Sequence, residues 1–112
     1  MVDMVIDDVE LRVSAQRALL GTINDGVLAV WMDAAESEIK VRVFVDRALS
    51  DDERDSLEAS GTEISADFPW GTTLDFRIIY QSTSKVQSPS FGLWVYQRYG
   101  CSLEISPDVP WI

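Results

Sequence analysis

Acidic side chains gathered in the segment 50–67 are the strongest chemical signal in this sequence. The segment holds seven Asp or Glu residues and one base, Arg54. The dipole of a helix favours acids in its first turn, but it favours bases at the other end, where the acids continue as far as Asp67. Two interpretations stay open: a solvated helix face, which is the common origin of a charge run, and a surface that attracts a cationic protein. The acids that we assign to partner binding are Asp51, Asp52, Asp55, Glu58, Glu63 and Asp67.

Bases and aromatic residues alternate on the expected strands and form a second candidate. Such a mixture can bind single-stranded nucleic acid, but the net charge of -10 repels phosphates. We favour a structural interpretation, in which cross-strand pairs on this face hold the sheet together. The second interpretation is self-association through Trp94, Tyr96 and Arg98. The residues expected on this outward face are Lys40, Arg42, Phe44, Arg77, Trp94, Tyr96 and Arg98.

Residue types that usually perform catalysis are scarce. The chain has no His and a single Cys, Cys101, which excludes a Ser-His-Asp triad, a Cys-His pair and an intramolecular disulfide. No calcium-loop, phosphate-loop or dinucleotide-binding pattern is present. We therefore predict no catalytic residue, no cofactor and no metal, and we expect Cys101 to be a small buried residue. Acid–base chemistry or ligand binding through carboxylates near the sheet is the weakest alternative.

Length and composition predict the number of domains and the location of the protein. A chain of 112 residues with 46% hydrophobic residues predicts one folded domain over 1–112. No apolar run reaches the roughly 20 residues that span a bilayer, and the first residues lack the basic start of a secretory signal. We expect a cytoplasmic protein that does not bind nucleic acid or membranes.

The first half of the chain predicts a helix followed by two strands. The helix is expected to start near Asp7 or Asp8 and to stop before Gly21. The segments 27–33 and 38–46 are expected to form an antiparallel hairpin. On the second of these strands, one face is wholly apolar and consists of Ile39, Val41, Val43 and Val45.

The second half predicts a second helix and two more strands. Ser50 and Glu53 have the spacing of a capping box, and Gly61 lies in the apolar stripe, where close approach to a sheet would explain it. The segments 74–80 and 91–99 alternate as strands, and Trp111 in the tail is expected to fold back onto the domain. Together, the predicted helices and strands indicate an α+β two-layer sandwich in the order α-β-β-α-β-β. Its sheet of four strands is mainly antiparallel, with two helices on one face and a parallel pairing possible at the centre.

Both helices carry a family resemblance. The segments Arg12–Gly21, Leu49–Arg54 and Thr62–Pro69 resemble the helices of small acidic bacterial immunity proteins of contact-dependent growth inhibition systems. Gly61 departs from the helix former expected there, and the C-terminal part of the chain matches only loosely.

The resemblance implies a protein that binds one toxin domain in the cytoplasm and blocks it. The toxins of such systems are often nucleases with basic clefts, to which an acidic inhibitor is suited. The resemblance supplies no catalytic residue. We therefore expect a non-enzymatic immunity protein with a basic toxin domain as its partner. The alternative is a structural or regulatory module that self-associates through its sheet face.

Overall fold

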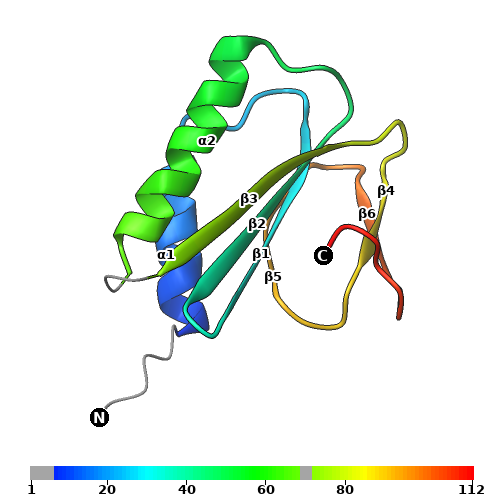
Figure 1. The fold of residues 1–112 in the computed structure, drawn as a ribbon. Coiled ribbons are helices and arrows are strands. Elements are labelled where there is room, and N and C mark those ends of the chain that lie inside the picture. Colours follow the sequence, from blue (N-terminus) through cyan, green and yellow to red (C-terminus); the bar gives the residue numbers. More distant parts are fainter. Residues whose placement is uncertain (1–6, 69–71) are drawn as a thin grey trace.

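The computed structural model describes residues 7–68 and 72–112 and shows three layers (Figure 1). Helices α1 (Asp8–Leu19) and α2 (Asp51–Ala66) cover one face of a four-stranded sheet with the order β3-β2-β1-β5. A two-stranded sheet, β4-β6, lies on the other side. The strands are β1 (Val27–Ala35), β2 (Glu38–Val45), β3 (Thr73–Tyr80), β4 (Lys85–Ser88), β5 (Leu93–Gln97) and β6 (Ser102–Ile105).

Local capping signals set the helix starts where the sequence predicts them. Asp7 caps α1 by accepting a hydrogen bond from the Val9 N–H at 2.7 Å. Ser50 and Glu53 form the complete capping box of α2, since each side chain accepts from the other residue's backbone N–H. Both helix starts and the capping box are confirmed.

Close packing of α2 on the sheet explains the glycine in its apolar stripe. Gly61 is buried, and a Cβ at this position would lie 2.7 Å from Cδ2 of Phe76 on β3. The lower helix propensity of glycine is therefore offset by close contact with the sheet, as the sequence suggested.

The first hairpin is confirmed, with β1 and β2 antiparallel. The predicted apolar face of β2 packs under the helices, where all four of its residues are buried. The turn between the strands has Glu36 and Ser37 at φ 52° and 64°. A two-residue hairpin turn with positive φ at both positions favours Asn-Gly, so this turn gives a weak sequence signal.

The expected sheet needs correction, although the α+β class and the helices on one face hold. The sheet is mixed, because β3 pairs with β2 in parallel while β1 pairs antiparallel with β2 and β5. A parallel pair needs a crossover, and α2 provides it between β2 and β3. The strands expected at 74–80 and 91–99 therefore lie at opposite edges of the sheet.

The predicted order of elements is also wrong, because the sequence analysis does not include two short strands. The structure reads α-β-β-α-β-β-β-β. The additional strands β4 and β6 pair in parallel, and Val86 of β4 is fully buried against the sheet. They make a third layer, which replaces the two-layer sandwich.

This third layer covers the sheet face that was expected to point outward. Phe44 is fully buried, and Trp94 is partly buried beside it with ring centroids 5.7 Å apart. Trp111 returns from the tail, as predicted, and packs edge-on at 4.9 Å from Phe44 and 5.0 Å from Trp31. This part of the face is an aromatic core that a partner cannot reach, whereas Lys40 and Arg77 keep exposed surface.

Arg42, at the centre of that face, has no exposed surface. Its guanidinium donates to Asp75 Oδ2 at 3.0 Å, to the Asp75 carbonyl at 2.8 Å and to the Trp111 carbonyl at 2.9 Å. Asp75 thus forms a cross-strand ion pair with Arg42. The arginine ties β3 and the tail to β2.

Trp94, Tyr96 and Arg98 do not share an open face, which corrects the surface proposed for self-association. The register of β1 and β5 shifts at Val95, so Tyr96 packs against the helix-side core while Trp94 faces the third layer. Arg98 forms an ion pair with Asp46. A bulge reverses the alternation that the sequence pattern assumed.

Candidate partner-binding surface

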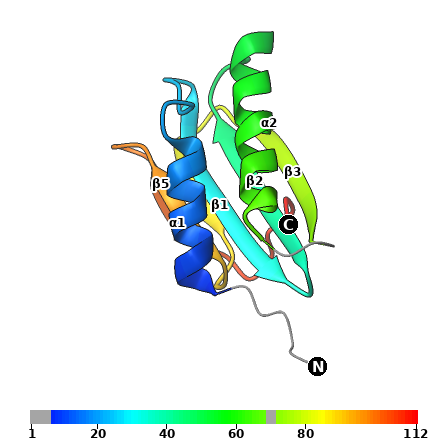
Figure 2. The same cartoon turned by 90° about the vertical axis from the view of Figure 1, so that its left-hand side faces the viewer.

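The outer side of α2 presents the predicted acids to solvent. We call Asp51, Asp52, Asp55, Glu58, Glu63 and Asp67 the acidic helix face; all six are exposed. The helix buries Leu57, Gly61 and Ile64 against the sheet, which leaves its other side free (Figure 2). The structure therefore exposes all six along the length of one element and its C-cap, where a partner could reach them.

Glu53, the seventh acid of the segment, has a structural task instead. Its carboxylate accepts from Arg47 at 2.7 and 2.9 Å and from the Ser50 N–H at 2.9 Å. The hydrogen bonds from Arg47 and from the Ser50 backbone lower the pKa of Glu53 to about 2. Arg47 also pairs with Asp25, so it joins the start of α2 to the turn before β1.

This network predicts a defined pH dependence of stability. A carboxyl whose pKa falls from 4.5 to about 2 on folding stabilises the fold above pH 4.5, and this contribution is lost as the pH falls toward 2. We expect Glu53→Gln to lower the melting temperature at pH 7, and the gap from the unaltered chain to narrow between pH 4.5 and 2. Thermal unfolding followed by circular dichroism measures it, with Glu58→Gln as the matched control. A gap that stays constant with pH would contradict the assignment.

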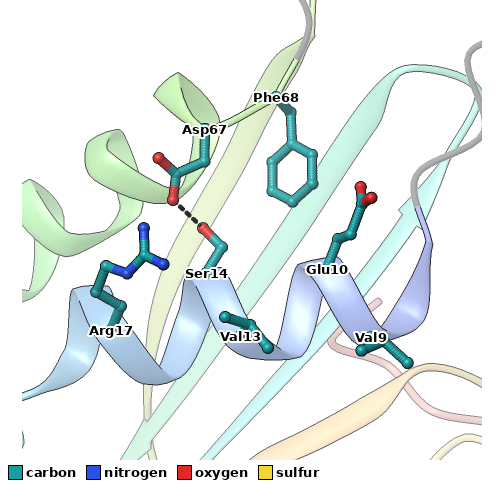
Figure 3. Close-up of a pocket in the computed structure, with 7 residues that line it drawn as sticks. All are labelled: Val9, Glu10, Val13, Ser14, Arg17, Asp67 and Phe68. Atoms are coloured by element: carbon teal, nitrogen blue, oxygen red, sulfur yellow. Dashed lines mark hydrogen bonds between the residues drawn. The ribbon is translucent and has the colours of Figure 1, made fainter.

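A groove between the two helices adjoins the acidic helix face (Figure 3). Asp67, at the C-cap of α2, accepts a hydrogen bond from Ser14 Oγ of α1 at 2.6 Å across the groove. Val9 and Val13 of α1 line the same groove and are 68% and 47% exposed. The groove has a volume of about 480 Å³. It combines apolar side chains with the carboxylate of Asp67 and the guanidinium of Arg17.

The valines were not identified as site residues from the sequence, although a signal exists. Val9, Val13 and Leu20 recur at intervals of four and seven, on the side of α1 away from its buried residues. Leu20, just beyond the helix, is 83% exposed. Exposed apolar side chains rimmed by charges typically mark a protein-interaction surface. The helix layer thus offers both charge and apolar contact area.

Other reactive groups do not gather at this surface. Cys101 is buried beneath the sheet, as predicted, and burial raises the pKa of its thiol. Within 7–68 and 72–112, no three His, Cys, Asp or Glu side chains are placed to hold a metal ion. In the same parts of the chain, no helix combines the length and apolar character needed to cross a membrane.

The comparisons with known proteins identify one family. Residues 8–100 match the model of the MafI2 immunity protein family. A search of curated proteins gives no match to this chain. The matched stretch runs from α1 to the turn after β5, so it contains the whole acidic helix face and the groove.

Proposed function

Because this chain belongs to the MafI2 immunity protein family, we propose that it binds a cognate toxin domain and thereby neutralises it. The family match over residues 8–100 is the observation that carries this proposal. The resemblance of the two helices to bacterial immunity proteins led to the same family type from the sequence.

Electrostatic attraction is the proposed means of recognition. The chain has a net charge of -10, and the acidic helix face concentrates exposed carboxylates on one side of α2. A basic toxin domain, for which a nuclease with a phosphate-binding cleft is the best candidate, would be attracted to this face. Action in the cytoplasm and delivery of the toxin by cell contact complete the proposal, both from the sequence resemblance.

Removal of three carboxylates from the acidic helix face tests this mode of binding. We expect Asp52→Ala, Asp55→Ala and Glu63→Ala in combination to slow association with the toxin domain by about 10-fold at low salt, because steering contributes 10-fold or more to such rates. The dependence of the rate on salt should flatten as well. Stopped-flow fluorescence over a salt series measures both quantities.

A control with equal charge separates local from overall attraction. Glu36→Ala, Glu104→Ala and Asp108→Ala in combination also remove three exposed acids, and none of these acids lies on α2. This variant should associate much faster than the α2 variant. Equal rates for the two variants would take the acidic helix face out of the interface.

A further inference from the structure

A second concave site lies at the N-terminal end of α2, outside both the acidic helix face and the groove. It has a volume of about 440 Å³ and lies between the ends of β2 and β3 and the start of α2. Val45, Leu49 and Ile78 supply apolar walls, while Arg54 and Tyr80 line it with a cation and an aromatic ring. This volume is ample for one large side chain of a partner.

The charge at this pocket comes from Arg54. Arg47 also lines the pocket, but its guanidinium is neutralised by Glu53 at 2.7 Å and by Asp25. Arg54 is exposed and forms no ion pair with the parts of the chain that the structure describes. It is therefore available to a ligand, although acids surround it along α2.

Tyr80 is the second side chain of this pocket that is available to a ligand. It ends the edge strand β3 and is 63% exposed, whereas the apolar walls of the pocket, Val45, Leu49 and Ile78, are buried or half-buried. An exposed tyrosine next to an exposed arginine is the composition of an energetic hot spot in protein interfaces.

The neighbouring acids select the kind of side chain that can enter. Asp51 and Glu58 lie one turn before and after Arg54, and Asp55 follows it directly, so a carboxylate from a partner would be repelled. An aromatic ring carries no such penalty. It gains apolar contact with Leu49 and Ile78, and it can stack on a guanidinium.

We propose that this pocket receives an aromatic side chain of the toxin, held between the ring of Tyr80 and the guanidinium of Arg54. The inference rests on the proposed function and adds the anchor to it. The acids around the pocket would contact basic residues that flank this aromatic side chain.

Affinity measurements with the toxin domain encoded immediately upstream test the pocket. Tyr80→Ser should weaken binding by about 30-fold, the size of a hot-spot loss, and Tyr80→Phe should bind like the unaltered chain. Arg54→Gln should weaken binding by about 10-fold although it makes the chain more acidic. Long-range attraction alone would predict the opposite sign for that change. Isothermal titration calorimetry gives the constants, and melting temperatures confirm that each variant is folded.

Matched controls isolate the pocket from surface effects. Tyr99→Ser removes a fully exposed tyrosine from the turn after β5, and Arg12→Gln removes an exposed base from α1; neither should weaken binding. Folded Tyr80→Ser and Arg54→Gln variants that bind within twofold of the unaltered chain would overturn the pocket and leave the proposed function standing. Absence of binding by the unaltered chain would overturn both.

Discussion

Replacing Arg42 by Ala is expected to lower the free energy of unfolding by about 3 kcal/mol, because it breaks a partly buried ion pair and leaves the buried acceptors of the guanidinium without a donor. The guanidinium has no exposed surface and bonds to Asp75 and to the Trp111 carbonyl. Burial raises the pKa of Asp75, but the hydrogen bonds and charges of Arg42 and Arg77 together outweigh it and leave this pKa below its usual value. Urea unfolding followed by tryptophan fluorescence measures the loss.

Arg77→Ala is the matched control for this prediction. Arg77 contacts the same carboxylate of Asp75 at 3.3 Å, but its side chain is 56% exposed. An exposed ion pair contributes at most about 1 kcal/mol, so this variant should remain close to the unaltered chain in stability. Equal losses for the two arginines would show that burial of Arg42 does not matter.

Gly92→Ala is expected to destabilise the fold by about 2–4 kcal/mol, through backbone strain and overpacking together. Gly92 has a φ of +85°, and a Cβ there would lie 2.5 Å from ring atoms of Trp31. Trp31 is fully buried, and its indole N–H donates to the Phe91 carbonyl at 3.1 Å. The ring therefore has little room to move away, and the loss should appear in the same urea unfolding experiment.

Gly100→Ala separates the two causes of this loss. Gly100 has a similar φ of +90°, but nothing lies within 4 Å of the added Cβ. It should cost only the backbone strain, about 1–2 kcal/mol. The excess at Gly92 then measures the contact with Trp31, and no excess would contradict the close packing seen there.

Features with short-range signals could be predicted from the sequence. The capping box at Ser50 and the apolar alternation of 38–46 depend on residues close together in the chain, and the structure has both. The return of Trp111 was also predictable, because a large apolar side chain in a tail needs a surface to cover it.

The pairings between distant segments could not be predicted from the sequence pattern. No local sequence feature indicates that β3 pairs in parallel with β2 rather than with β5, or that β4 and β6 pair with each other. The error at Arg42 has the same origin, because a base on a strand is expected to face water until another layer covers it. A bulge at Val95 likewise leaves no mark in an alternating pattern.

The acidic helix face could be predicted from the sequence, whereas the pocket could not. The acids of α2 stand out as a run of charge, and the structure exposes them as expected. The pocket with Arg54 and Tyr80 joins α2 to β3. Their meeting depends on the parallel crossover, which the sequence pattern did not determine.

One growth assay tests the central claim most directly. The C-terminal domain of the protein encoded immediately upstream is expressed in bacteria alone, with this chain, or with the α2 variant lacking Asp52, Asp55 and Glu63. Neutralisation of a cognate toxin predicts that the domain stops growth and that this chain restores it, with weaker rescue by the variant. A domain that leaves growth unchanged, or toxicity that this chain does not relieve, would contradict the proposed function.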